Sequence, residues 1–123
     1  MVDVYRTFFD TIAQVVQLFD TWAGLLGPSD YREWVLPVHR EIAARVDREA
    51  APLILYVRGG AHVVDQMLDS GVDVISVDWR VDLAAVARAA GARASVQGNL
   101  DPCALAAPAP EISRRVREMV EQA

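Results

Sequence analysis

The sequence has no lysine, only one cysteine, and no long run of apolar residues. All 12 basic residues are arginines, so chemistry that needs a lysine Schiff base is excluded. The single cysteine, Cys103, cannot form a disulfide within the chain, and no apolar stretch approaches the roughly 20 residues of a membrane-spanning helix. The first residues lack the charged, then apolar, then small-residue pattern of a signal peptide. These absences predict a cytoplasmic protein without membrane association.

The composition suits a single domain. The chain has 123 residues, of which 53% are hydrophobic and 24% charged. The net charge is -5, and basic residues do not alternate with aromatic ones in any run, so nucleic acid is not expected as a partner. We expect one domain over residues 1–123.

Strand and helix patterns alternate along the chain. Pro37 lies within one helical pattern and predicts a kink near Leu36, and Ser29 or Asp30 is expected to cap that helix. Such alternation predicts an α/β fold of parallel β/α units, either an open sheet or a partial (β/α)₈ barrel. Strands are predicted over 15–19, 52–57, 74–77 and 94–97, and helices over 2–14, 30–49, 61–70, 83–90 and 111–122.

Polar residues follow the predicted strands, at the edge where parallel α/β folds bind ligands. Asp20 and Asp78 can either contact a ligand or cap the helix that follows, whereas a capping or turn role is favoured for Asn99. Arg58 stands beside Gly59 and Gly60 and is the best candidate for binding a carboxylate, although a surface salt bridge explains it nearly as well.

The remaining chemically distinctive side chains have simple structural interpretations. Cys103 is expected to be a small buried thiol, since no histidine is near it in sequence. His39 and His62 have no other metal-ligand residues at a suitable spacing in sequence, so both are expected at the surface or the edge of the core. The three tryptophans are expected to pack between helices and sheet: Trp22, Trp34 and Trp79.

Four segments together resemble the successive motifs of the uroporphyrinogen decarboxylase family. The resemblance extends from about Val15 to the last helix, and the order and spacing of the motifs match. Related cobalamin and methionine-type methyltransferases share the family's fold but resemble these motifs less well. The segments are VQLFDTWAG at 16–24, YREWVLP at 31–37, DWRVDL at 78–83 and QGNLDP at 97–102.

The resemblance implies a (β/α)₈ barrel that removes the carboxyl groups of the four acetate side chains of uroporphyrinogen, giving coproporphyrinogen in haem synthesis. It implies no metal or prosthetic group. The protein must then supply arginine partners for the substrate carboxylates and an acid group that stabilises the cationic ring. Thr21 stands where the family usually has a serine whose hydroxyl contacts the substrate. The expected substrate-binding residues are Thr21, Arg58, Asp78 and Asn99.

Several family features are missing or changed. The arginine-rich amino-terminal motif, the catalytic aspartate and the later glycine-histidine-glycine motif do not occur in this sequence. Arg58 replaces a common lysine, and Ala13-Gln14 replaces the usual Gly-Ala-Asp before the first strand. We therefore expect about four β/α units of a decarboxylase barrel, to which no catalytic residue is assigned.

Two other functions remain open. The chain can be a non-catalytic partial barrel that serves as a binding or structural module. It can also be a methyltransferase relative, which would need a zinc site for which Cys103, His39 and His62 are too few. In a partial barrel, unpaired sheet edges and an uncovered apolar face favour pairing with a second copy, so we expect a homo-oligomer, a homodimer being the simplest.

Overall fold

The structure is a computed structural model, and it describes residues 13–46 and 51–122. The helix predicted over 2–14 lies almost entirely outside the described residues. Its last two positions, Ala13 and Gln14, are not helical. The description therefore begins with the first strand.

Four parallel strands form one sheet in the order β1-β2-β3-β4. Each strand pairs with the next one along the chain, which is the arrangement of successive units in a (β/α)₈ barrel. All four strands were predicted, to within one residue at each end, and the α/β class with parallel units is confirmed. The strands are β1 (Val16–Asp20), β2 (Leu53–Val57), β3 (Val74–Ser76) and β4 (Ser95–Gln97).

The connection between β1 and β2 contains a 3₁₀ turn, η1 (Ala23–Leu25), and a helix with an irregular middle. The helix begins as α2 (Pro28–Asp30), widens into a π-helical turn, η2 (Tyr31–Val35), and continues as α3 (Leu36–Arg45). The predicted irregularity near Leu36 is therefore present, because Pro37 lacks the N–H that a regular α-helix would use there.

Two details of this helix differ from the sequence prediction. The N-cap is Gly27, with Pro28 in the first helical position, so neither Ser29 nor Asp30 caps the helix. The helix ends at Arg45, before the predicted end near residue 49, because Val46 already has an extended backbone.

The later connections are shorter. The predicted helix over 61–70 is a 3₁₀ turn, η3 (Gly60–Val63), followed by the brief α4 (Val64–Leu68). Helix α5 (Leu83–Ala90) has the predicted limits, and Asp82 caps it by accepting the N–H of Ala85 at 3.2 Å. The last helix is α6 (Ala109–Gln122), preceded by an unpredicted 3₁₀ turn, η4 (Pro102–Ala106).

The core lies between one face of the sheet and the helices. Leu18, Leu55 and Ile75 occupy paired positions on β1, β2 and β3, and all three are buried. Side chains of the helices and turns pack on this row and cover its apolar surface, which the hydrophobic effect favours. They include Tyr31, Leu36, Ile42, Val63, Met67, Leu68 and Val86.

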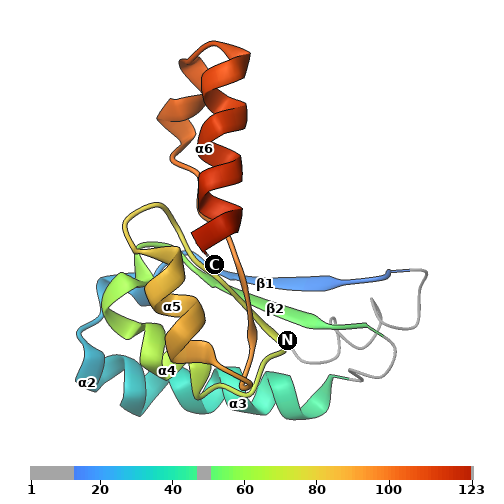
Figure 1. Cartoon of the computed structure of the whole chain (residues 1–123). Helices are drawn as coiled ribbons and strands as arrows, with labels where there is room; N and C mark the ends of the chain where they lie inside the picture. The colour runs from blue at the N-terminus through green and yellow to red at the C-terminus, as the bar shows by residue number, and fades with distance from the viewer. Residues whose placement is uncertain (1–12, 47–50, 123) are drawn as a thin grey trace.

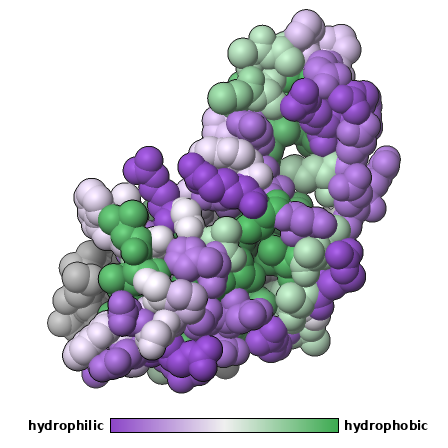
Figure 2. Space-filling model, turned by 90° about the vertical axis from the view of Figure 1, so that its left-hand side faces the viewer, coloured by the Kyte–Doolittle hydropathy of each residue, from purple (hydrophilic) through white to green (hydrophobic). Residues whose placement is uncertain are grey.

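Figure 1 shows α3, α4 and α5 gathered along one side of the sheet, with α6 extending away from the rest of the molecule. In Figure 2 the same α6 region forms a narrow arm that carries both hydrophilic and hydrophobic surface. In the described part of the chain, no helix is long and apolar enough to cross a membrane.

The opposite face of the sheet carries a mixed row of side chains. Phe19, Tyr56, Ser76 and Gln97 are register partners across the four strands. Phe19 meets Tyr56 edge to face, with 5.8 Å between ring centroids, and the amide nitrogen of Gln97 donates to the Ser76 hydroxyl at 3.2 Å. In a closed barrel this face would line the interior.

Four predictions of burial are wrong. Cys103 is exposed, because it lies in η4, outside the main core, and the residue that η4 buries is its neighbour Ala104. Trp22 is 75% exposed, and Trp34 and Trp79 are exposed as well. Trp22 and Trp79 follow β1 and β3 at the open end of the sheet, and Trp34 lies on the outer side of η2.

Candidate functional site at the carboxyl ends of the strands

The carboxyl ends of β1, β2 and β3 surround a pocket of about 330 Å³, called here the carboxyl-end pocket. The turn after β1 contributes Thr21 and Trp22, the end of β2 contributes Arg58, and the loop after β3 contributes Arg80. Two arginines and a threonine thus line one small cavity, a combination suited to an anion. The remaining lining residues are Gly24, Leu25 and Gly59.

Asp78 holds the basic side of this pocket in place. Its side chain is only 3% exposed, and its Oδ2 accepts hydrogen bonds from Arg80 Nη1 at 2.7 Å and from the Gly59 N–H at 3.2 Å. Its Oδ1 accepts from the Arg80 N–H at 3.0 Å. The Arg80 guanidinium also lies over the Trp79 ring, 4.2 Å from its centroid. Arg80 is therefore oriented by both an ion pair and an aromatic ring.

Asp20 holds the other side of the pocket through the turn after β1. Its Oδ1 accepts the N–H groups of Ala23 at 2.9 Å and Trp22 at 3.3 Å. Its Oδ2 lies 3.1 Å from Nε2 of His39, whose Nδ1 lies 3.0 Å from the Tyr31 hydroxyl oxygen. His39 is thus buried and hydrogen-bonded at both ring nitrogens, contrary to the expected surface or core-edge location.

The burial of this cluster shifts two pKa values. Burial lowers the pKa of His39 from its usual 6.5, and the charge and hydrogen bond of Asp20 oppose the shift. Burial, reinforced by the charge of Asp20, raises the pKa of Tyr31 above its usual 10.0. At neutral pH the ring of His39 and the hydroxyl of Tyr31 are therefore both uncharged.

The two sides of the pocket meet at Gly24. A Cβ atom at this position would overlap the carbonyl oxygen of Arg58, so the turn after β1 approaches the end of β2 as closely as only glycine permits. The Arg58 N–H also donates to the Asp20 carbonyl oxygen at 3.2 Å. These contacts fix Thr21 and Arg58 on neighbouring backbone segments.

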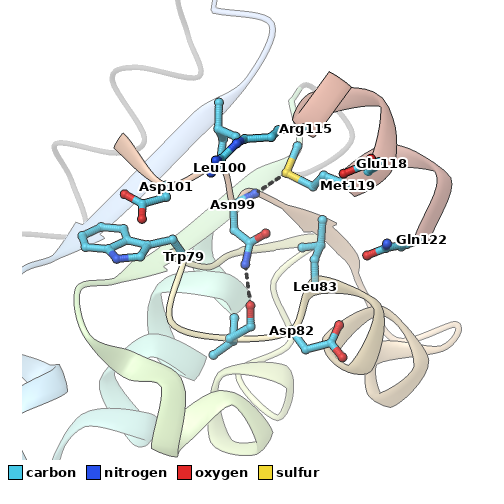
Figure 3. Close-up of a pocket in the computed structure, with 11 residues that line it drawn as sticks. Trp79, Asp82, Leu83, Asn99, Leu100, Asp101, Arg115, Glu118, Met119 and Gln122 are labelled. Carbon is cyan, nitrogen blue, oxygen red and sulfur yellow. Dashed lines mark hydrogen bonds between the residues drawn. The ribbon is translucent and has the colours of Figure 1, made fainter. Parts of the chain in front are cut away.

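Asn99 lies in a different pocket, of about 380 Å³, between the loops after β3 and β4 and helix α6. In Figure 3 its side-chain amide points to a loop carbonyl and its backbone to Met119. The amide nitrogen donates to the carbonyl oxygens of Val81 at 2.7 Å and Asp78 at 3.0 Å, and the Asn99 N–H lies 3.0 Å from the sulfur of Met119. This side chain joins the loop after β3 to the loop after β4.

The structure thus brings together Thr21 and Arg58 and puts Asp78 beside them, whereas Asn99 lines another pocket and contacts only the backbone of Asp78 among these residues. Sequence reasoning missed Arg80 and His39. The signal for Arg80 was its place two residues after a strand-end carboxylate, whereas no local pattern marks His39. The second histidine, His62, is exposed, and its Nε2 lies 2.8 Å from the Leu26 carbonyl oxygen. Within residues 13–46 and 51–122, no group of three or more His, Cys, Asp or Glu residues could hold a metal ion.

Consecutive parallel strands, each paired with the next along the chain, define a segment of a β/α barrel, and a basic pocket lies at their carboxyl ends. The family model for uroporphyrinogen decarboxylase (URO-D) matches residues 1–123, the whole chain. The chain belongs to the uroporphyrinogen decarboxylase family, as its motifs predicted.

Curated relatives agree with this assignment. The chain is 47% identical to the uroporphyrinogen decarboxylase of Gloeobacter violaceus, over 93% of this chain and 33% of the relative. It is 44% identical to that of Crocosphaera subtropica, over 96% of this chain and 34% of the relative. It is 39% identical to uroporphyrinogen decarboxylase 1, chloroplastic, of Oryza sativa subsp. japonica, over 90% of this chain and 28% of the relative. The chain spans about a third of the length of the curated relatives it matches.

Proposed function

We propose that this chain contributes part of the substrate site of a uroporphyrinogen decarboxylase, and that the carboxyl-end pocket binds a carboxylate side chain of uroporphyrinogen. The observation that carries the proposal is that Arg58, Arg80 and Thr21 line one cavity. Guanidinium groups bind carboxylates through paired, charge-assisted hydrogen bonds, and a nearby hydroxyl adds a third donor. The family membership of the chain supports this choice of substrate.

The predicted binding residues take different parts in this proposal. Thr21 and Arg58 contact the substrate directly. Asp78 acts through Arg80 and Gly59, because its buried carboxylate already accepts three hydrogen bonds. Asn99 acts through the loop after β3, whose carbonyl groups it binds.

The carboxyl-end pocket is proposed to bind the substrate and not to transfer protons. Loss of CO₂ from an acetate group next to a pyrrole is helped by an acid group that stabilises the protonated ring. None of the described residues that line the carboxyl-end pocket is an acid. Turnover therefore depends on groups outside this pocket.

The lack of an acid in the pocket lining also supports a second candidate, a non-catalytic module of the same family that binds a porphyrinogen-type molecule or has a structural role. A methyltransferase function has less support, since the described residues contain no cluster of metal ligands. Binding and turnover must therefore be measured separately.

We further propose that the chain acts in the cytoplasm and forms a homo-oligomer, with a homodimer as the simplest case. In the described residues, β1 and β4 are the outer strands of the sheet. Val15, just before β1, and Phe19, within it, are exposed apolar residues. Unpaired strands of this kind pair readily with another chain. Light scattering at micromolar concentration tests this proposal, and a strictly monomeric species would contradict it.

The direct test is the affinity of the purified chain for uroporphyrinogen, kept reduced under anaerobic conditions, with decarboxylation followed on the same sample. We expect Arg58→Gln to weaken binding by about tenfold, through loss of one charge-assisted contact. Arg88→Gln is the matched control, because Arg88 is an exposed arginine on α5 that does not line the pocket. Equal affinities for the two variants would refute the proposed site. Binding without turnover would favour the non-catalytic module.

A further inference from the structure

We propose that His39 is a positioning residue, whose ring holds the Asp20 carboxylate and thereby fixes the turn that presents Thr21 to the carboxyl-end pocket. The inference deepens the proposed function and rests on it for the role of Thr21. It connects a buried residue of α3 to the pocket through two hydrogen-bonded steps, from His39 to Asp20 and from Asp20 to the turn.

The hydrogen bonds define which proton the ring carries. An Asp20 carboxylate can only accept hydrogen bonds, so His39 must donate to it through Nε2–H. Nδ1 then has a lone pair facing the Tyr31 hydroxyl, which donates its proton to the ring. The neutral Nε2–H tautomer satisfies all three side chains, and the other neutral tautomer would place a lone pair against the carboxylate.

The burial of the cluster excludes a direct catalytic role. The Tyr31 side chain is 0% exposed and His39 only 3%, so a substrate in the pocket cannot touch either. Asp20 is 27% exposed and has both oxygens engaged, Oδ2 by His39 and Oδ1 by the N–H groups of Ala23 and Trp22. These two N–H groups belong to the residues that directly follow Thr21 in the turn. His39 therefore acts on the pocket through this turn.

Protonation of His39 disturbs the arrangement at one known point. A ring with protons on both nitrogens can no longer accept the Tyr31 hydroxyl proton, while its bond to Asp20 persists and gains charge. Among the described residues, the titratable groups hydrogen-bonded to the ring are Asp20 from the end of β1 and Tyr31 from η2. The position of the Asp20 carboxylate, and with it the turn, is therefore coupled to the protonation of His39.

The test uses nuclear magnetic resonance of the full chain without any ligand. The ¹⁵N shifts of the His39 ring report its tautomer and its titration, and the amide signals of Trp22 and Ala23 report the turn. We expect the neutral Nε2–H tautomer at pH 7.5, and amide signals of Trp22 and Ala23 that move with the same midpoint as the ring as the pH falls. Amides that do not follow the ring, or the opposite tautomer, would overturn the inference.

Two variants and a control separate positioning from general stability. His39→Gln keeps an N–H donor for Asp20 but does not titrate, so the amide signals should keep their neutral-pH positions and lose the His39 transition. His39→Leu removes the donor and should shift both amide signals at every pH. Ile42→Val is the control, because Ile42 is buried on the same helix and its side chain has no polar group. A shift of the two amides as large in the control as in His39→Leu would contradict the inference, and His39→Gln keeps the test valid if His39→Leu does not fold.

Uroporphyrinogen affinity at pH 7.5 then connects the turn to the pocket. We expect His39→Leu to weaken binding at least threefold, and His39→Gln to restore it to within twofold of the unmodified chain. Unchanged affinity in His39→Leu, with Arg58→Gln still impaired, would overturn the link to Thr21 alone. Unchanged affinity in Arg58→Gln would overturn the proposed function, while the ligand-free spectra would still decide whether His39 controls the turn.

Discussion

At the ends of β1 and β3 an aspartate carboxylate holds the following turn, but its other hydrogen-bond partner differs between the two strands. Asp20 ends β1 and Asp78 follows β3, and Oδ1 of each accepts N–H groups of the next turn, from Trp22 and Ala23 at Asp20 and from Arg80 at Asp78. The second oxygen differs, because Asp20 meets the imidazole of His39 whereas Asp78 meets the guanidinium of Arg80. A histidine can change charge near neutral pH and an arginine cannot.

The direction of each network differs as well. From Asp20 the hydrogen bonds lead inward, through His39 to the fully buried Tyr31. From Asp78 they lead outward, to an arginine that lines the pocket. The first aspartate anchors the pocket to the core, and the second supplies it with an oriented cation.

The largest effect is expected where the two strand ends touch. Gly24→Ala places a methyl group against the carbonyl oxygen of Arg58, and backbone atoms cannot move aside as a flexible side chain can. We expect the free energy of unfolding to fall by about 3 kcal/mol, measured by urea denaturation. Gly27→Ala, where a Cβ meets nothing within 4 Å, should cost less than about 1 kcal/mol. Equal costs for the two variants would mean that the close approach is not a constraint.

The Asp78 network should be the next most sensitive. Asp78→Asn keeps the size of the side chain but replaces one accepting oxygen with an NH₂ donor, which then faces N–H donors of Arg80 or Gly59. We expect a loss of about 2 kcal/mol in urea denaturation, typical of buried hydrogen bonds to charged groups. Asp82→Asn is the control, because asparagine caps a helix as well as aspartate does and its cost should stay below about 0.5 kcal/mol. A cost for Asp78→Asn no larger than the control's would show that Asp78 is not structurally required.

The Asp20 network can be weakened from its inner end. Tyr31→Phe removes the hydroxyl that donates to His39 Nδ1 and leaves that nitrogen buried and unpaired. We expect a loss of about 1 kcal/mol in unfolding free energy. Tyr56→Phe is the control, since the structure gives the Tyr56 side chain a ring contact with Phe19 and no hydrogen bond to a described residue. If both variants cost the same, the hydroxyl of Tyr31 contributes nothing through His39.

The smallest expected effect is the pH dependence that distinguishes the two networks. The pKa of His39 is lowered by folding, so below pH 6.5 the unfolded chain binds more protons at this site than the folded chain does. The His39 contribution to stability is therefore complete above pH 6.5 and is lost as the pH falls from 6.5 through the lowered pKa. The loss is modest because Asp20 opposes the shift. Urea denaturation across this range should show a steeper decline for the unmodified chain than for His39→Gln. Parallel declines would contradict this assignment.

Much of the fold was predictable from the sequence because the signals are local. Short, largely apolar runs marked the first three strands, and the pattern of Leu83–Ala90 after Asp82 predicted the limits of α5. The convergence of Thr21, Arg58 and Asp78 was also predictable, because adjacent parallel strands end at the same edge. The start of α2 was missed because Pro28 preset the first helical turn before Ser29 and Asp30.

Other features depend on contacts that no local pattern records. His39 and Asp20 are 19 residues apart in sequence, and helical periodicity shows only that His39 lies on α3. Trp22 and Trp79 are exposed because they lie in turns at the carboxyl ends of the strands, and Trp34 because it lies on the outer side of η2, which hydrophobicity alone cannot predict. The place of Arg80 in the pocket depends on its ion pair with Asp78, which no sequence pattern reveals.

The consecutive order of the strands has a consequence for how the molecule is made. Since each strand pairs with the one synthesised just before it, no strand must wait for a distant part of the chain before it can dock. Each new unit adds its helix to a surface already in place and covers apolar groups as they emerge from the ribosome. The sheet can therefore grow in the direction of translation, and the turn that carries Thr21 becomes fixed as soon as the next strand is delivered.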